Sequence, residues 1–99
     1  MAKVEIKRLY PEKNSTECYQ ACLQMVEKAG YQVFKKREIA SLVICNGKIN
    51  GLPVSLSAMV PFGLPTAVML SLSSEEAGED VLNVETGRLF ALLEAELRL

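Results

Sequence analysis

Residues 55–74, SLSAMVPFGLPTAVMLSLSS, decide the fold, because polar and aliphatic side chains alternate there on both sides of a break bounded by two prolines. Alternation with a period of two is typical of β-strands whose two faces meet different surroundings. One face is aliphatic in both strands, and it consists of Val54, Leu56, Ala58, Val60, Val68, Leu70 and Leu72. The stretch therefore predicts a β-hairpin whose aliphatic face belongs to the core.

The opposite face of this predicted hairpin carries no charge. Its members are small hydroxyls and methionines, namely Ser55, Ser57, Met59, Met69, Ser71 and Ser73. Such a face can be exposed to solvent, pack against another sheet or subunit, or line a shallow cavity for a small apolar ligand. With Pro61 to Pro65 as the loop, Leu56 is expected opposite Leu70, and Ser55 opposite Ser71. Phe62, expected to be exposed at the tip of that loop, joins the six residues as a candidate ligand or interface residue.

The segments before the hairpin predict one strand and one helix. Residues 2–10, AKVEIKRLY, alternate and end at Pro11, which lacks the backbone N–H that a strand ladder needs. Residues 14–30, NSTECYQACLQMVEKAG, have apolar residues at helical spacing. Asn14 and Glu17 have the spacing of a capping box, and Gly30 stands where a helix end needs a left-handed residue.

The middle of the chain is predicted to be extended, but the position of its turn stays open. Residues 31–45, YQVFKKREIASLVIC, are rich in aromatic and β-branched residues. Within them the charged segment Lys35–Glu38 is interpreted as a bend or an exposed crossing. Asn46-Gly47 and Asn50-Gly51 are both hairpin signals, and one of the two can mark a bulge instead.

A second helix is expected from about Asn83 to the end of the chain. Its apolar stripe consists of Leu82, Thr86, Leu89, Leu93 and Leu97, with Phe90 and Leu92 at the flanks. The charged residues outside this stripe are expected to be solvated, and they are Glu85, Arg88, Glu94 and Glu96.

Together these elements predict a single α+β domain over residues 1–99, in the order β-α-β-β-β-α. We expect an antiparallel sheet of four or so strands with both helices packed on one face. The pattern of KVEIKRLY (3–10), EKAGYQV (27–33), CNGKINGLPVSLSAMVPFG (45–63) and PTAVMLSLSS (65–74) resembles the TATA-binding-protein-like half-domain and the helix-grip proteins of the START and pollen-allergen type. The resemblance implies a concave sheet gripping a helix, with a groove for a ligand or a second subunit.

The chain has no histidine and three cysteines, and both counts restrict its chemistry. Without histidine the chain lacks the commonest general base. This absence excludes serine–histidine triads, cysteine–histidine pairs and most catalytic zinc sites. An odd cysteine count argues against a secreted disulfide framework. Cys18 and Cys22 lie one helical turn apart near a helix N-terminus, which lowers the pKa of a thiol, so a thiol-dependent redox protein or enzyme is one alternative. Both of these and Cys45 fall on apolar stripes, which favours burial instead, and no catalytic, metal or cofactor set is assigned.

Charge is distributed unevenly along the chain, whose formal net charge is −1. Residues 1–50 carry nine Lys and Arg against five acids (+4), and residues 51–99 carry two against seven (−5). A basic strip of Lys3, Lys7, Arg8 and Lys35–Arg37 is the basis for a second alternative, nucleic-acid binding. This alternative is not favoured, because the hydroxyl-bearing face lacks the aromatic residues that stack on bases.

The leading hypothesis is a small, non-enzymatic binding module. Its sheet surface is expected either to form a homodimer or to bind a small apolar ligand. No apolar run approaches the roughly 18–20 residues of a membrane-spanning helix, and the N-terminus has no apolar segment of a signal peptide. A cytoplasmic location is therefore expected.

Overall fold

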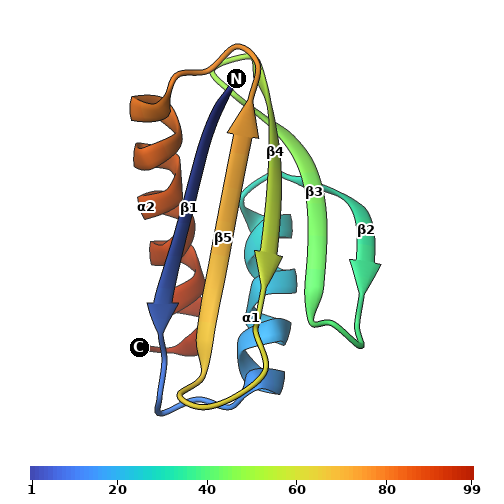
Figure 1. The fold of residues 1–99 in the computed structure, drawn as a ribbon, viewed down its shortest axis with the longest axis vertical. Helices are drawn as coiled ribbons and strands as arrows, with labels where there is room; N and C mark the ends of the chain where they lie inside the picture. Colours follow the sequence, from blue (N-terminus) through green and yellow to red (C-terminus); the bar gives the residue numbers. More distant parts are fainter.

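The computed structural model describes residues 1–99 as two layers, an antiparallel sheet and two helices that cover one of its faces (Figure 1). The elements are β1 Ala2–Leu9, α1 Ser15–Lys28, β2 Gln32–Arg37, β3 Leu42–Ile49, β4 Leu52–Met59, β5 Ala67–Ser74 and α2 Glu79–Leu97. The sheet order is β1-β5-β4-β3-β2, so β1 and β2 are its edges. We call the covered side of the sheet the helix face and the other side the open face.

The α+β class and the antiparallel sheet are confirmed, but the sheet has five strands, one more than the order β-α-β-β-β-α contains. The additional strand is β2, and it includes Lys35–Arg37, most of the segment Lys35–Glu38 that was interpreted as a bend or an exposed crossing. All of its residues are exposed. An edge strand pairs on one side only, so its charged side chains remain in water and the segment needs no burial to be a strand.

The β4–β5 hairpin has the predicted faces in a different register. The observed pairs are Ser55–Ser73, Leu56–Leu72, Ser57–Ser71, Ala58–Leu70 and Met59–Met69, where the prediction paired Ser55 with Ser71 and Leu56 with Leu70. The loop is longer than expected because its two ends bond to other segments. Val60 donates its backbone N–H to Ser41, and the carbonyl of Thr66 accepts from Tyr10. The shift is two residues, an even number, so every side chain stays on its predicted face.

The turn between β3 and β4 is Asn50-Gly51, with φ of 52° and 82°. Positive φ at both central residues is what a two-residue hairpin needs. Asn46-Gly47, the other candidate, lies inside β3. Gly47 is required there because the ring of Tyr31 packs over it, and a Cβ at position 47 would lie 2.6 Å from a ring carbon.

Both helices have the predicted buried stripes, although α2 begins earlier than predicted. In α1, the Asn14 side chain accepts from the Glu17 backbone N–H at 2.7 Å, and the Glu17 carboxylate accepts from Asn14 at 3.1 Å, so the capping box is confirmed. α2 starts at Glu79 instead of about Asn83. Two acidic residues in its first turn favour this start, since negative charge stabilises a helix N-terminus. Neither helix is both long and apolar enough to cross a membrane.

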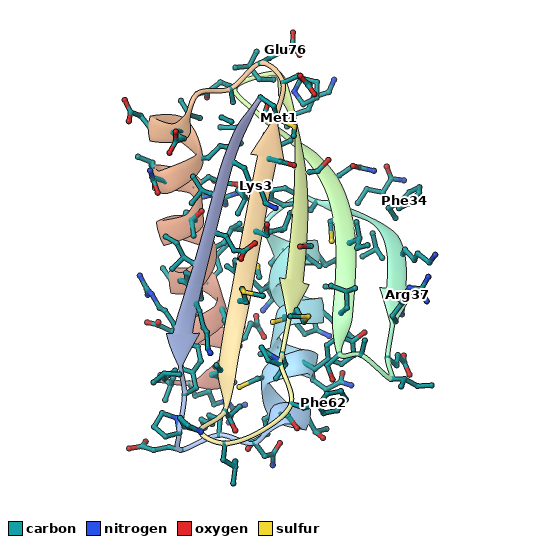
Figure 2. The ribbon with its side chains drawn as sticks, in the orientation of Figure 1. Met1, Lys3, Phe34, Arg37, Phe62 and Glu76 are labelled. Atoms are coloured by element: carbon teal, nitrogen blue, oxygen red, sulfur yellow. The ribbon has the colours of Figure 1, made fainter.

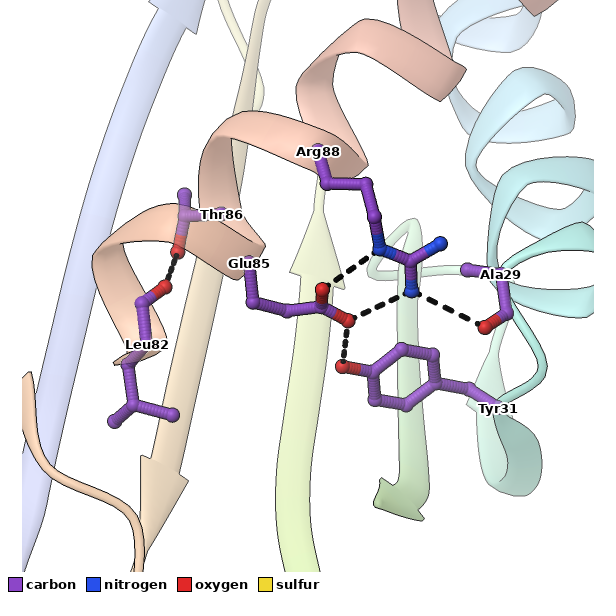
Figure 3. Close-up of polar contacts among 6 residues, drawn as sticks. All are labelled: Ala29, Tyr31, Leu82, Glu85, Thr86 and Arg88. Atoms are coloured by element: carbon purple, nitrogen blue, oxygen red, sulfur yellow. Dashed lines mark hydrogen bonds and ion pairs between the residues drawn. The ribbon is translucent and has the colours of Figure 1, made fainter. Parts of the chain in front are cut away.

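A buried carboxylate joins α2 to the segment after α1 (Figure 3). Tyr31 donates its hydroxyl to Glu85 at 2.6 Å, and Arg88 donates two N–H groups to the same carboxylate at 2.7 and 2.8 Å. Arg88 also donates to the carbonyl of Ala29 at 3.3 Å. The prediction that Glu85 is solvated is therefore wrong, because only the folded chain brings Tyr31 beside it. We call Tyr31, Glu85 and Arg88 the Tyr31 cluster.

A second cluster of the same composition ties α2 to β1. Tyr10 donates its hydroxyl to Glu94 at 2.9 Å, and Arg8 donates to that carboxylate at 3.0 Å. The guanidinium of Arg8 also lies 4.4 Å from the ring centre of the buried Phe90. Glu94 and Glu96 are thus half-buried in ion pairs, Glu96 with Lys28, rather than free in solvent as predicted. We call Tyr10, Glu94 and Arg8 the Tyr10 cluster.

Candidate functional site

The open face brings together the six predicted residues of β4 and β5. Ser55 is exposed and the other five are half-buried, and they form three cross-strand rows of Ser55 and Ser73, Ser57 and Ser71, and Met59 and Met69. We call these six residues the hydroxyl–methionine strip. Both helices lie on the opposite side of the sheet, so no element of the chain covers the strip (Figure 1). The pairing of β4 with β5 makes one surface out of two separate segments.

The three rows of the strip continue onto β3, which sequence reasoning did not include in the site. Asn46 lies beside Ser55, Ile44 beside Ser57 and Leu42 beside Met59. The face therefore changes along the strands from a polar end to an apolar end. Residues 42–46, LVICN, are a run of four apolar residues and one polar residue, so no alternation separates their two faces. The face of each residue follows only once Asn50-Gly51 is known to be the turn, because the turn sets the register of β3.

Phe62 lies in the loop between β4 and β5, outside the paired strands (Figure 2). Its side chain is 85 % exposed, and that of Leu64 in the same loop is 91 % exposed. The predicted exposure of Phe62 is confirmed. Its place is beyond the apolar end of the open face, so it extends the candidate surface instead of lying within it.

The other end of the open face contains a shallow hollow of about 600 Å³, close to Met1 and Glu76 (Figure 2). Most of the residues that line it are polar in type, among them Ser55, Ser73 and Asn46. The Ser55 hydroxyl lies 3.5 Å from the side-chain oxygen of Asn46, a long hydrogen bond.

The residues of the predicted basic strip are divided between two edges and two faces. By register, Lys3 and Lys7 of β1 lie on the open face, and so do Lys35 and Arg37 of β2 at the opposite edge. Arg8 and Lys36 have the register of the helix face. The two basic rims are separated by the hydroxyl–methionine strip, with about 19 Å between the edge strands at ordinary strand spacing.

The helices carry the opposite charge. Together α1 and α2 contain seven acidic residues and two basic ones, which are Glu17, Glu27, Glu79, Asp80, Glu85, Glu94 and Glu96 against Lys28 and Arg88. The uneven charge along the sequence is thus an uneven charge between the layers. An anionic partner is attracted to the rims of the open face and repelled by the helix layer.

All three cysteines are buried, as their positions on apolar stripes predicted. Burial raises the pKa of the Cys22 thiol to about 12 and that of the Cys45 thiol to about 11. Burial, with Glu17 nearby, also raises the pKa of the Cys18 thiol, which contradicts the lowering expected at a helix N-terminus. These thiols do not support the thiol-dependent alternative, because the reactive form is the accessible thiolate.

The structure contains no group of three or more histidine, cysteine, aspartate or glutamate side chains placed to hold a metal ion. The open face presents hydroxyls and thioethers at its centre, with the charged side chains of its rims and of Lys48 around them. No model of a known protein family matches the chain, and no curated protein matches it either.

Proposed function

We propose that this chain is a non-enzymatic interaction module that forms a homodimer through the open face of its sheet. The observation that carries the proposal is the hydroxyl–methionine strip, which is uncharged and lies uncovered in the middle of that face. In a two-fold interface each patch meets its own copy. A charge at the centre would therefore repel itself, and the strip has none.

The size of the open face fits an interface. Five strands at about 4.8 Å spacing give a width of about 24 Å, and eight residues give a length of about 26 Å. The resulting footprint of about 600 Å² approaches the ~800 Å² that each partner buries in a stable complex. Loop residues such as Phe62 add to that area. The whole face, and not the strip alone, is therefore the proposed interface.

The side chains of the strip suit contact between copies. Met59 and Met69 provide flexible apolar contacts, which are enriched in the cores of interfaces. The four serines can form hydrogen bonds across the interface with no charge to desolvate. Burial of the methionine side chains contributes hydrophobic free energy to dimer formation. The serine rows keep the desolvation cost of the interface low, because they carry no charge.

The basic rims oppose this association and give it a distinctive salt dependence. Lys3 and Lys7 on one edge, with Glu5 between them, and Lys35 and Arg37 on the other, face the rims of the second copy when two open faces stack, and both rims keep a net positive charge. Stacked sheets lie about 10 Å apart, which is close to the Debye length of about 10 Å at 0.1 M salt. Salt screens this repulsion, so we expect the dimer to be stronger at high salt.

The proposal is tested by native mass spectrometry and by light scattering at low and high salt. We expect twice the chain mass, with a larger dimeric fraction at high salt. Ser57→Lys places a charge at the centre of the strip and is expected to give monomers. Gln24→Lys, on the exposed side of α1, adds the same charge elsewhere and is expected to remain dimeric.

Other results would contradict the homodimer. A monomeric wild-type chain at high concentration and high salt excludes it. A fixed extra mass on each chain, lost in Met59→Lys, would instead support the second candidate, a small apolar ligand on the methionine end of the strip. Association that weakens with salt would indicate an anionic partner at the rims.

A further inference from the structure

We propose that the outer edge of β2 binds an extended, acidic segment of a partner protein as an added strand of the sheet. β2 pairs only with β3, so one side of this strand of six residues presents backbone N–H and C=O groups with no strand beside them. Such an edge can accept a further strand through main-chain hydrogen bonds. The outer edge of β2 is distinct from the hydroxyl–methionine strip, although Lys35 and Arg37 also lie at the rim of the open face. The proposal does not depend on the homodimer.

The charge of β2 selects the partner. Lys35, Lys36 and Arg37 are consecutive and exposed, and none of them takes part in the ion pairs of the chain. By register, Lys35 and Arg37 lie on the open face and Lys36 on the helix face. An added strand therefore meets a cation on each of its own faces. Acidic side chains on either face of a bound segment have a partner of opposite charge.

An exposed aromatic residue provides an apolar contact on the same edge. Phe34 is the extra residue of a β-bulge between Val33 and Lys35, and its side chain is 72 % exposed. Figure 2 shows Phe34 and Arg37 on the outer side of β2. Val33 next to it is 42 % exposed. An apolar side chain of the bound segment can cover Phe34, which nothing in the chain covers.

The same features exclude the simplest alternative occupants. Two β2 edges from two copies would bring three cations against three, which is repulsive at the distance of paired strands. Cations and a bulge hinder the pairing of an edge strand with neutral or basic strands, and the cations attract an acidic one. The other edge, β1, differs because Lys3 there is paired with Glu5 at 3.9 Å and its charges alternate.

The probe is the fluorescein-labelled peptide Glu-Val-Glu-Val-Glu-Val-Glu, and its binding is measured by fluorescence anisotropy. We expect saturable binding to the wild type. In a Lys35→Glu, Lys36→Glu double variant we expect the affinity to fall roughly tenfold, because the combined contribution of a few surface ion pairs is lost. A Lys3→Glu, Lys7→Glu double variant changes the net charge equally on the other edge and is expected to bind as the wild type does. Ser57→Lys, which tests the homodimer, is expected to bind the peptide unchanged.

A backbone control separates strand addition from simple charge attraction. The same peptide with every backbone nitrogen methylated keeps its charges and loses its N–H donors, and we expect it not to bind. Amide hydrogen exchange in β2 is expected to slow on binding of the unmethylated peptide. Equal binding of the methylated peptide, or equal loss of binding in the two double variants, would overturn the proposal and leave a general anion-binding surface.

Discussion

The two faces of the sheet are built from alternate residues of the same strands, yet the polar side chains on the two faces differ in how fully the chain itself satisfies their hydrogen bonds. On the helix face every buried side-chain nitrogen and oxygen has a hydrogen-bond partner, and two tyrosine–glutamate–arginine clusters join α2 to the rest of the chain. On the open face the serines lie in rows with little bonding to the chain itself. Satisfied polar groups fix a structure, whereas hydroxyls with free capacity are available to another molecule.

Adjacent residues on β5 provide the largest contrast between these faces. Leu72 is fully buried on the helix face, and Ser71 is half-buried on the open face. We expect Leu72→Ala to lower the free energy of unfolding by about 2–5 kcal/mol, because it removes apolar contacts and leaves a cavity. Ser71→Ala is expected to change it by less than about 0.5 kcal/mol. Urea unfolding of both variants measures the difference, and similar losses would contradict it.

A pair of glycines gives the next contrast. Gly47→Ala directs a Cβ into the ring of Tyr31. We expect the resulting overpacking to lower the free energy of unfolding by about 1–3 kcal/mol. Gly87 lies in α2 with no atom near its potential Cβ, so Gly87→Ala is expected to stabilise by about 1 kcal/mol through helix propensity. Thermal unfolding of the two variants should move in opposite directions. A neutral Gly47→Ala would show that the Tyr31 ring moves aside freely.

The smallest effect concerns a single hydroxyl and is tested best by pH. Tyr31→Phe keeps the ring over Gly47 and removes only the hydrogen bond to Glu85, so we expect a loss of about 1–2 kcal/mol at neutral pH. Burial, together with the hydrogen bond to Glu85 and the charge of that carboxylate, raises the pKa of Tyr31 above its usual value. Above about pH 10 the unfolded chain therefore releases a proton that the folded chain retains.

This proton release lowers the stability of the wild type as pH rises above that point. Tyr31→Phe lacks this contribution, so its loss of stability between pH 9 and 11 should be smaller than that of the wild type. The buried thiols contribute equally to both proteins and cancel in the comparison. Equal alkaline slopes in urea unfolding would show that the Tyr31 hydroxyl titrates alike in both states. Substitutions in the hydroxyl–methionine strip are expected to leave the change of the free energy of unfolding with pH the same as in the wild type.

Local patterns in the sequence predicted the faces of the sheet, because burial imposes a period of two on every strand that has one side in the core. The capping box of α1 and the apolar stripe of α2 follow the same logic at helical spacing. Register was less predictable, since the ends of the β4–β5 loop bond to Ser41 and Tyr10, residues distant in sequence. The edge strand β2 was predicted only as part of a longer extended segment, and its charged second half was taken for a bend, because these residues meet no core that would give them a pattern.

Burial of charge was the least predictable property. Glu85 looks like a solvated helix residue in the sequence, and only the tertiary contact with Tyr31 shows otherwise. Burial alone would raise the pKa of Glu85, but hydrogen bonds from Arg88 and Tyr31 outweigh it and lower the pKa. That the six residues of the hydroxyl–methionine strip share one face was easier to predict, because alternation and the absence of charge can be seen without knowing any tertiary contact.

The position of β1 in the sheet has a consequence for folding during synthesis on the ribosome. β1 is the first strand of the chain, but its neighbour in the sheet is β5, and Ala2 pairs with Ser74. At about 5–20 residues per second, a ribosome needs several seconds to deliver that neighbour after β1 is made. During this time the strand has no place in a sheet, and the charged side chains of Lys3, Glu5 and Lys7 keep it dispersed in water. β1 can therefore enter the sheet only after β5 has been made.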